Sequence, residues 1–583
     1  MTKRIGATFA VAGMLAATAC AGHGGSLPPI GSQSPASSGA ATSRAVSAAA
    51  AAPSGWAPTG TQALQLANAS DRGALAASTP LTVRLGLQLR NADGLKAAVA
   101  GGTRVDPSAF DAQYAPTPAQ VAAVTAYLRG QGFTNIAVEP NNLLVSADAT
   151  SAIVQKAFDT TLHAFTQQNT NVFANTSPAF VPQSLSGIVV AVLGLNNAVK
   201  VRAAPITPCG IGSGATCVRF DYNPSTFWKT YDVGSTPAGS NTSVAVMAEG
   251  DVSSVIGDLR VAESHFGLPQ VPASVVRVGL ASPDVAGVDE WDLDTQASSG
   301  MAGALKHLYI YATTSLTDSD IALEYNKWVT QDLAQIGNSS FGGCEFGPYL
   351  DGSMLVDDEI LLQGAAQGQT MFASSGDTGS FCSVGTPNGV PAGAPLVEYP
   401  AASPYVVAVG GTTLLSNADA SYEGELAWNA GGGGVSQFEY SPYWQQGVQP
   451  SNPSAAGAPV SLRGLPDIAM DADPNTGADV YVGGALTVIG GTSLSSPLAA
   501  GVYARLQSAH DNALGLGSPA FYKIYSQATP GAPVAGPPPT RAYGGFHDIL
   551  TGGNGAYSAL PGFDYTTGLG TFDVSATNAT IGK

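Results

Sequence analysis

The sequence predicts an α/β fold, in which helices flank a parallel sheet, preceded by a smaller α+β domain. Beyond residue 242, short apolar runs alternate with helical patterns, which is typical of a parallel sheet with helices on both faces. Before residue 200, a strand of alternating polarity, two helical segments and a hairpin indicate a small antiparallel sheet. The length of 583 residues also favours more than one domain.

The first residues are typical of an export signal. Lys3 and Arg4 precede an apolar run, and small residues then lead to Cys20. We expect residues 1–20 to be the signal peptide of a secreted protein, with lipoprotein anchoring through Cys20 as the alternative. Residues 21–75 are expected to form a disordered linker, because this region is rich in alanine, serine, glycine and proline.

Residues 76–200 are predicted to form the small domain. Leu81–Leu89 alternates apolar and polar positions, which indicates a strand with one buried face. Thr117 is placed as the N-cap of a helix, a hairpin follows around residues 141–142, and a second helix covers about 152–158. Two helices on a small antiparallel sheet predict a ferredoxin-like arrangement.

Residues 201–240 hold prolines, glycines and polar residues, so we expect a linker in which processing occurs. Residues 241–583 are predicted to form the larger domain. Its expected strands cover residues 243–249, 275–280, 308–312 and 370–374, and its expected helices cover 256–266, 320–333 and 357–367.

Acidic residues outnumber basic residues in this chain. There are 41 aspartates and glutamates against 23 lysines and arginines, which gives a net charge of −18. This excess argues against a nucleic-acid partner, because phosphates are bound by basic side chains. It suits acidic surroundings, where protonated surface carboxylates reduce the self-repulsion of the folded chain.

Cysteine usage agrees with export. The chain has five cysteines, and removal or lipidation of Cys20 leaves four. An even number of cysteines in an exported chain can form disulfides. The preferred pairing is Cys209–Cys217 and Cys344–Cys382.

A catalytic serine is predicted in the glycine- and serine-rich turn Gly490–Pro497, which precedes a helical run. Ser493 would lie at the N-terminus of this helix, where free amides and the helix dipole favour a developing oxyanion. A plain turn that caps a helix is the alternative. A catalytic serine needs a base, but none of the six histidines lies in a His-Gly-Thr setting, and no Gly-x-Ser-x-Gly elbow is present.

Two carboxylates could replace the missing histidine. Glu290 and Asp294 are four residues apart on a predicted helix, so their side chains meet on one face. Two adjacent carboxylates do not both ionise easily, and one keeps its proton to a higher pH. Glu290 is therefore predicted to accept the Ser493 proton below neutrality while Asp294 orients it. An acidic helix N-terminus, which the helix dipole favours, is the alternative.

Asp377 follows an apolar strand in the stretch Ser374-Ser-Gly-Asp377. An aspartate at the carboxyl end of a parallel strand is placed for an active site. If it were protonated, Asp377 could donate a hydrogen bond to the oxyanion, whereas its ionised form would repel that charge. A turn aspartate is the alternative.

A glycine-rich loop joins two further acidic residues, Asp548 and Asp564. Two carboxylates on such a loop can enclose Ca²⁺, with backbone carbonyls as further hard ligands. A solvated loop explains the same spacing equally well.

At these residues the sequence resembles the sedolisin family of serine-carboxyl peptidases, of the kumamolisin and pro-kumamolisin type. The resemblance covers about residues 80–580. The matching motifs, in chain order, are Glu290-Trp-x-Leu-Asp294, Ser375-Gly-Asp377, Arg463-Gly-Leu-Pro-Asp467, Gly491-Thr-Ser493 with Pro497, and Asp548-Ile549 with Gly562-Phe-Asp564.

The resemblance implies a subtilisin-like peptidase domain at residues 241–583 and a pro-kumamolisin activation domain at residues 76–200. It implies Ser493 as nucleophile, Glu290 as base, Asp294 as its partner and Asp377 as the oxyanion acid. The strand Ser339, Ser340, Phe341 and Gly342 would pair with the backbone of a polypeptide substrate. One structural Ca²⁺ would be held by Asp548, Asp564 and the carbonyls of Ile549, Leu560 and Gly562, although relatives carry glycine in place of Leu560.

The small domain would act as an intramolecular chaperone and inhibitor, removed by self-cleavage at low pH within residues 201–240. We therefore expect a secreted, acid-active endopeptidase that is a monomer. A catalytically inactive surface binding protein on a protease-like fold is the second hypothesis. The presence of all four catalytic residues argues against it.

Overall fold

The computed structural model describes residues 52–201, 203, 206, 221–382, 394–449, 462–534 and 538–583. The predicted signal peptide of residues 1–20 and the predicted Cys209–Cys217 pair lie outside the described residues. Within the described ranges, no helix is both long enough and apolar enough to cross a bilayer.

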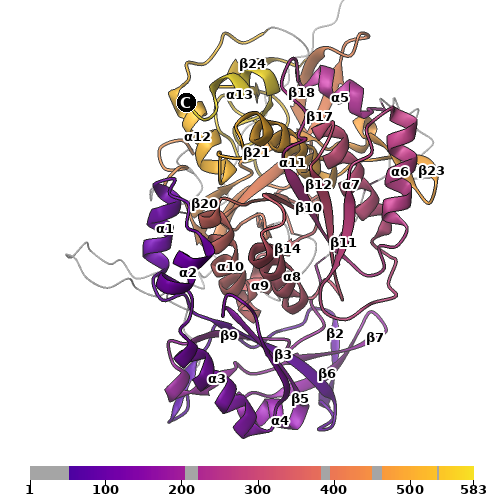
Figure 1. The fold of residues 1–583 in the computed structure, drawn as a ribbon. Coiled ribbons are helices and arrows are strands. Elements are labelled where there is room, and N and C mark those ends of the chain that lie inside the picture. Colours follow the sequence, from indigo (N-terminus) through magenta and orange to yellow (C-terminus); the bar gives the residue numbers. More distant parts are fainter. Residues whose placement is uncertain are drawn as a thin grey trace, which may run out of the picture. The chain divides into compact units, whose positions relative to one another are not determined.

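The small domain is built on a four-stranded antiparallel sheet with the order β4-β5-β3-β9. Along the chain its elements are β3 (Pro80–Leu87), α3 (Pro118–Gln131), β4 (Thr134–Val138), β5 (Leu144–Thr150), α4 (Ser151–Ala157) and β9 (Val189–Leu193). This succession of strands and helices is ferredoxin-like. The predicted class of the small domain, drawn in indigo and purple in Figure 1, is therefore confirmed.

Local sequence signals set both ends of helix α3. The Thr117 side chain accepts the Gln120 N–H and the Gln120 side chain accepts the Thr117 N–H, which forms a capping box. Gly132 ends the helix in the left-handed region with φ 95°. Between these ends, Val124 and Leu128 are fully buried in the core of the small domain.

The small domain holds more ordered structure than the sequence predicts. β1 (Trp56–Pro58) pairs with β8 (Phe180–Pro182), and β2 (Ala69–Ala74) pairs with β6 (Leu162–Gln167), which also pairs with β7 (Thr170–Asn175). The prediction of a disordered linker over residues 21–75 is therefore wrong for its last part. These short strands are ordered by partners far along the chain, which local composition does not reveal. Helices α1 (Ala92–Ala100) and α2 (Pro107–Gln113) were also not predicted.

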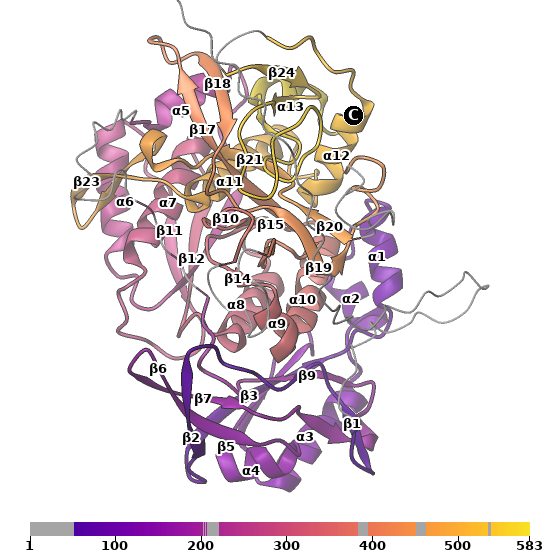
Figure 2. The same ribbon diagram turned by 180° about the vertical axis from the view of Figure 1, so that it is seen from behind.

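The larger domain is built on an eight-stranded sheet, in which β18 is antiparallel and the other strands are parallel. Its strands, in spatial order, are β11 (Ala273–Arg277), β12 (His307–Thr313), β10 (Ser243–Glu249), β13 (Ile336–Ser339), β15 (Thr370–Ser374), β17 (Val406–Ser416) and β18 (Tyr422–Ala427), while β21 (Ile468–Asp471) also pairs with β17. Figure 2 shows the sheet from behind.

Helices flank this sheet and place the functional residues. They are α6 (Val255–Phe266), α7 (Val288–Ala302), α8 (Asp318–Gln331), α9 (Phe346–Asp351), α10 (Ser353–Gln367), α11 (Thr492–Ala509), α12 (Gly517–Gln527) and α13 (Val574–Thr580). Helix α7 packs against both α6 and α11, and α8 packs against α10. The central strand β10 is buried from Ser243 to Ala248, as expected for a parallel strand covered on both faces.

Short elements complete the larger domain. They are β14 (Gly343–Cys344) with β16 (Glu398–Tyr399), β19 (Gly434–Tyr440) with β20 (Leu462–Leu465), the hairpin β22 (Ala478–Val482) and β23 (Ala485–Ile489), and the sheet of β24 (Thr540–Tyr543), β25 (Phe546–Ile549) and β26 (Thr571–Phe572).

Part of the predicted linker 201–240 belongs to the folded larger domain. Helix α5 (Pro224–Thr230) begins with Asn223 as its N-cap and Pro224 in its first turn. The same proline and polar residues that suggested a linker are in fact the start signals of a helix. Just before it, Tyr222 donates its N–H to the Gly477 carbonyl and accepts the Asp479 N–H.

The small domain contacts helices α8 and α10 of the larger domain through polar side chains. Arg84 donates to the Ser319 hydroxyl at 2.6 Å and pairs with Asp320 at 3.0 Å. Asn141, predicted as a turn residue, is buried and donates to Asn326 at 2.6 Å and to Gln363 at 2.8 Å. This interface thus satisfies polar groups that the small domain alone would leave to water.

The second predicted cysteine pair is brought together but not joined covalently. Cys344 lies on β14, and a hydrogen bond links its sulfur with that of Cys382. Both residues are present as thiols, so the predicted Cys344–Cys382 disulfide is not formed in this structure.

Candidate active site

The predicted carboxylate pair lies on helix α7, at the centre of the larger domain. Glu290 is in the first turn and Asp294 one turn later, and both side chains are fully buried. Gly303 ends the helix with φ 73° in the left-handed region. A helix that is buried on nearly every side holds its side chains rigidly, so the two carboxylates have fixed positions.

The predicted nucleophile lies on a second helix, α11. Ser493 is the second residue of α11 and is only 4% exposed. Gly491 precedes the helix with φ 105°, which side chains rarely adopt. The serine therefore sits at a helix N-terminus, as predicted, among amides that have no partner within the helix.

Ser493 and the carboxylate pair meet across the contact between α7 and α11. The Ser493 hydroxyl is close enough to the Glu290 carboxylate to lower its pKa, but neither carboxylate oxygen has a hydrogen-bond partner within 3.5 Å among the described residues. The hydroxyl lies 3.5 Å from the Ser340 carbonyl, so the contact with Glu290 is loose in this structure. Loose contacts of this kind are common in catalytic groups before a substrate is bound.

Burial raises the pKa of both carboxyl groups of the pair. For Glu290 the loss of water is the largest cause, and the charge of Asp294 is the second. Burial also raises the pKa of Asp294, against hydrogen bonds from Ser340 and Asn338. The pair therefore holds a proton to a pH well above the usual range of carboxyl groups, as the sequence predicts.

Asp377 is bound to the residue next to the nucleophile. Its Oδ1 atom accepts the Thr492 N–H at 2.7 Å and the Thr492 hydroxyl at 2.8 Å. A Cβ atom on Gly491 would lie 2.7 Å from Oδ2, so glycine keeps the space beside this oxygen open. Burial raises the pKa of Asp377 to about 6, which keeps it protonated in acid. A protonated Oδ2 could then donate to an oxyanion.

Ser340 has a second role that the sequence did not predict. It was predicted only as part of the substrate-binding strand, but its hydroxyl donates to Asp294 Oδ1 at 2.6 Å. Asn338 in turn donates to the Ser340 hydroxyl at 3.0 Å and accepts the Ser496 hydroxyl at 2.7 Å. This chain of hydrogen bonds orients Asp294, and no local sequence pattern could reveal it.

The other predicted substrate-binding residues are buried beside the carboxylates. Ser339 pairs in the sheet with Ala373, and its hydroxyl contacts the Tyr325 hydroxyl at 2.9 Å. The Phe341 ring packs against the rings of Trp291 and Tyr325. Since Ser339 is already within the sheet and Gly342 forms a β-bridge, Ser340 and Phe341 are the part of this segment that lies outside β-pairing.

Glu398 is a half-buried acidic residue of the site that the sequence did not predict. A Cβ atom on Gly376 would lie 2.8 Å from its carboxyl carbon, and one on Gly342 would lie 3.2 Å from its Oε2 atom. Burial, followed by the charge of Asp377, raises the pKa of Glu398 to about 8. It stands more than twenty residues after Asp377, so only the pairing of β14 with β16 brings it here.

The predicted calcium ligands lie on one loop. Asp548 and Asp564 are both buried. Asp548 accepts the Gly562 N–H at 3.0 Å, and Asp564 accepts the Leu560 N–H at 2.9 Å. Arg541 forms an ion pair with Asp548. Among the described residues, no group of three or more His, Cys, Asp or Glu side chains is placed to hold a metal.

The arrangement defines a class of enzyme. A serine at a helix N-terminus, next to a buried pair of carboxylates and facing a protonated aspartate, has the parts needed for acyl transfer without histidine. The fold that carries it is subtilisin-like, with the nucleophile on a helix that packs against the sheet. These features are typical of a serine-type peptidase.

Comparisons with known proteins agree with this class. Residues 67–198 match the pro-kumamolisin activation domain, and residues 285–529 match the subtilase family. Sedolisin from Pseudomonas sp. (strain 101) is 37% identical over 568 residues, which cover 90% of this chain and 92% of sedolisin. Xanthomonalisin from Xanthomonas sp. (strain T-22) is 36% identical over 571 residues, which cover 87% of this chain and 66% of xanthomonalisin.

A solved structure gives the same result. The structure of Pseudomonas sedolisin, a serine-carboxyl proteinase complexed with two molecules of pseudo-iodotyrostatin, is 36% identical to this chain. The match covers 98% of that structure and 62% of this chain, with a TM-score of 0.55. The chain therefore belongs to the sedolisin family, and it is a serine-type peptidase with an N-terminal activation domain.

Proposed function

We propose that this protein is an acid-active endopeptidase, made as a self-inhibited precursor that processes itself at low pH. The observation that carries this proposal is the burial of Glu290 and Asp294 against Ser493, with Asp377 bound to the adjacent Thr492. Such a site needs protons that are absent at neutral pH.

The mechanism follows from the positions of these groups. Glu290 accepts the Ser493 proton as the serine oxygen attacks the carbonyl carbon of the scissile peptide bond. Protonated Asp377 and the amides at the start of α11 stabilise the oxyanion. Glu290 then passes the proton to the leaving amine, and a water molecule hydrolyses the acyl-enzyme by the same path. Asp294, held by Ser340, keeps Glu290 oriented.

A backbone contact between the segment after the activation domain and a residue near Ser493 supports self-processing. Ile206, which follows the activation domain, exchanges two backbone hydrogen bonds with Gly490, three residues before Ser493. The Gly490 N–H donates to the Ile206 carbonyl at 2.8 Å, and the Ile206 N–H donates to the Gly490 carbonyl at 3.3 Å. This antiparallel pairing is the manner in which an extended peptide binds a protease. We infer that the cut falls within the predicted segment 201–240, and that the activation domain inhibits until then.

Export remains part of the proposal. The predicted signal peptide of residues 1–20 directs the precursor out of the cell, where it acts on polypeptide substrates as a monomer. The pattern of Lys3, Arg4 and the apolar run that follows supports this.

Calcium binding at the loop between Asp548 and Asp564 is also proposed. The donor chemistry fits, because burial raises the pKa of Asp548 and raises that of Asp564 to about 6, and a divalent cation would offset the cost of burying their charges. The carbonyls of Ile549, Leu560 and Gly562 are the proposed further ligands. The ion would supply structural stability to the loop. Chelation should therefore lower the melting temperature near pH 7, and an unchanged melting temperature would contradict the site.

The decisive experiment compares the wild-type precursor with Ser493→Ala at about pH 4, close to the ordinary carboxyl pKa values. We expect wild type to shorten to the mature form and to cleave casein, whereas Ser493→Ala stays intact. Ser495→Ala is the matched control, because the Ser495 hydroxyl contacts only the Thr492 carbonyl of its own helix. Processing by Ser493→Ala would rule out Ser493 as the nucleophile, whereas an intact wild-type band would favour an inactive binding protein.

A further inference from the structure

The back of the catalytic helix carries a third buried carboxyl group that the mechanism does not use. Asp292 lies between Glu290 and Asp294 on α7 and is 0% exposed. Residues two apart on a helix point in different directions, so Asp292 faces away from its two neighbours. No hydrogen-bond donor of the described residues reaches either of its carboxyl oxygens.

The polar group that meets Asp292 is another carboxyl group, that of Asp258 on α6. A side-chain hydrogen bond links the two. Two ionised carboxylates have no hydrogen to share, so this contact exists only when one of them is protonated. The hydrogen bond between Asp292 and Asp258 therefore depends on a proton that a carboxyl group can lose.

The surroundings decide which of the two residues carries that proton. Asp258 accepts the Gly484 N–H at 2.7 Å and the Gly483 N–H at 3.1 Å. Both oxygens of Asp258 therefore already accept an amide hydrogen. Asp292 has no such donors, so it is the partner that supplies the hydrogen and donates to Asp258. Gly483 and Gly484, with φ 57° and 77°, form the turn between β22 and β23.

The pair therefore links three elements: α6, α7 and the β22–β23 hairpin. One turn further along α7, Gln296 strengthens the same junction. Its Nε2 donates to the Tyr481 carbonyl at 2.7 Å, and its Oε1 accepts the Tyr481 N–H at 2.8 Å. The face of α7 opposite the active site is thus attached to the hairpin by polar contacts.

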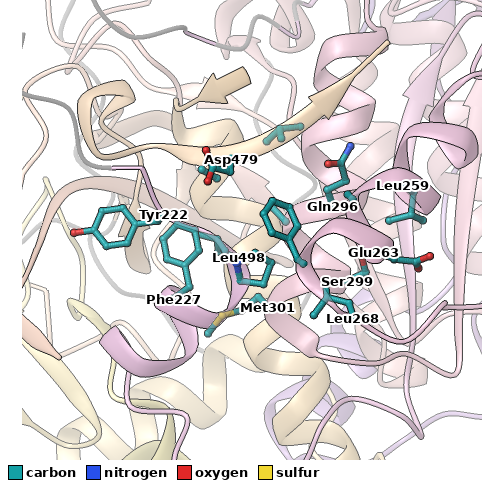
Figure 3. A pocket seen from close by; sticks show the side chains of 16 residues that line it. Tyr222, Phe227, Leu259, Glu263, Leu268, Gln296, Ser299, Met301, Asp479 and Leu498 are labelled. Carbon is teal, nitrogen blue, oxygen red and sulfur yellow. The ribbon is translucent and has the colours of Figure 1, made fainter. Parts of the chain in front are cut away.

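The apolar part of this junction is incompletely packed. Figure 3 shows a pocket between the same three elements and α5, with Leu259 of α6, Gln296 of α7 and Asp479 of β22 around it. Leu259 directly follows Asp258. A pocket provides fewer packing contacts than a filled core, so the polar contacts at its edge contribute more to holding α7 in place.

We propose that Asp258 and Asp292 form a proton-dependent clamp that positions helix α7. When the shared proton is lost, two adjacent negative charges are buried between α6 and α7. The helices then separate, and Glu290 and Asp294 move away from Ser493. Asp258 and Asp292 are positioning residues, because neither touches the reacting groups. The tests of this clamp that measure peptidase activity also rest on the proposed function.

The electrostatic surroundings of Asp292 also favour a clamp that is closed in acid. Burial is the largest cause that raises the pKa of Asp292, to about 8, followed by the charges of Asp258 and Asp289. Arg260 and Glu263 on α6 form a pair with each other. The remaining charged or titratable side chains on elements packed against α7, outside its own active-site pair, are Lys229, Glu249, His265, Asp479, Tyr481, Tyr503 and Arg505. The clamp is thus closed in acid and opens as the pH rises through about 8.

The test replaces the Asp292 carboxyl group, which can lose its proton, with a side chain that is always a donor. In Asp292→Asn the side-chain amide donates to Asp258 at every pH. Mature enzyme is incubated at pH 6 to 10 with a trace of subtilisin, which cuts molecules whose clamp has opened, and is then assayed at about pH 4. The cuts persist in the assay, whereas the reversible titration of the active site does not enter the result. We expect activity within about threefold of wild type after acid incubation, and a half-inactivation pH raised by about one unit or more.

Two variants serve as controls. Asp289→Asn removes the exposed neighbouring charge and should shift half-inactivation by less than about half a unit. Asp292→Leu removes the donor and should lose activity even after acid incubation, since the buried Asp258 side chain then lacks its hydrogen-bond partner on α7. An Asp292→Asn enzyme with the wild-type half-inactivation pH would overturn the clamp.

A second measurement requires neither peptidase activity nor a substitution at Asp258 or Asp292. Hydrogen exchange of the β22–β23 hairpin is followed by mass spectrometry in the Ser493→Ala precursor. After correction for the intrinsic effect of pH, exchange at Gly483 and Gly484 should rise at least about tenfold between pH 7 and 9, because Asp258 releases these amides. No rise would overturn the proposal. If wild type had no peptidase activity, the proposed function would fail while this measurement still tested the clamp.

Discussion

Hydrogen bonds decide which oxygen of Asp377 is able to carry a proton. Its Oδ1 is occupied by two donors from Thr492, so its other oxygen alone can carry the proton that an oxyanion needs. Burial raises the pKa of Asp377 to about 6. The donor is therefore present below about pH 6 and is lost as the pH rises through that value.

Asp377→Asn tests this role, because the asparagine oxygen can still accept from Thr492 while its nitrogen donates at every pH. We expect the fall in kcat near pH 6 to move to higher pH. Asp377→Ala removes the donor and should lower kcat about 10²–10³-fold. The measurement is kcat against pH for a peptide substrate. An unshifted profile in Asp377→Asn would mean that another group causes the alkaline loss.

Ser340 illustrates a residue whose side chain acts on catalysis through another residue. It donates to Asp294 at 2.6 Å, and a hydrogen bond to a charged group is worth about 1.5–3 kcal/mol. Ser340→Ala should therefore lower kcat about 10- to 100-fold, with a smaller change in KM. Ser299→Ala is the control, since that buried hydroxyl bonds only to the Thr295 carbonyl. Equal losses in both variants would indicate a general packing effect.

At the scale of elements, a buried ion pair connects β20 and β21 to the central sheet. Arg463 and Asp467 are both 0% exposed and are 2.7 Å apart. The Arg463 guanidinium also donates to the Val406 carbonyl at 3.0 Å, at the start of β17. The Arg463-Gly-Leu-Pro-Asp467 motif is thus explained by structure rather than by chemistry at the active site.

Arg463→Ala should lower the free energy of unfolding by about 3–5 kcal/mol, because Asp467 would remain buried without its partner. Lys229→Ala provides the contrast, since the Lys229–Asp419 pair is more than half exposed on both sides. Its removal should cost less than about 1 kcal/mol. Urea unfolding of the Ser493→Ala precursor measures both. A loss below about 1 kcal/mol in Arg463→Ala would show that the buried pair has no stabilising role.

Over the whole molecule, many carboxyl groups are buried where water cannot solvate their charge. Burial raises the pKa of Glu359 and of Glu398 to about 8, and raises that of Glu324 and Asp471 well above the usual range. In the unfolded chain these groups titrate near about 4. The folded state therefore binds more protons than the unfolded state between these values, and stability falls as the pH rises through this interval.

We expect the melting temperature of the Ser493→Ala precursor to be highest in acid and to fall steadily from about pH 5 to about pH 8. Differential scanning calorimetry over this range measures it, and the inactive variant prevents self-digestion. A melting temperature that rises toward pH 8 would show that the buried carboxyl groups are ionised in the folded state.

Local patterns of the sequence determined much of the fold. Alternating polarity gave the strand at Leu81, the capping residues at Thr117 gave α3, and apolar runs gave β10 and β15. The i and i+4 spacing of Glu290 and Asp294 predicted two carboxyl groups together on one helix, where the structure has them. These features depend on neighbours within a few residues, so the chain shows them before it folds.

Only the tertiary structure decided which distant groups meet. Ser340 reaches Asp294, Glu398 reaches the neighbourhood of Asp377, and Asp258 reaches Asp292, through sheet pairing and helix packing. The strands at residues 56 and 69 are also ordered by partners more than ninety residues away. The physical reason is that protonation and hydrogen bonding depend on burial and on neighbours in space. Neither burial nor the neighbours in space can be read from the order of residues along the chain.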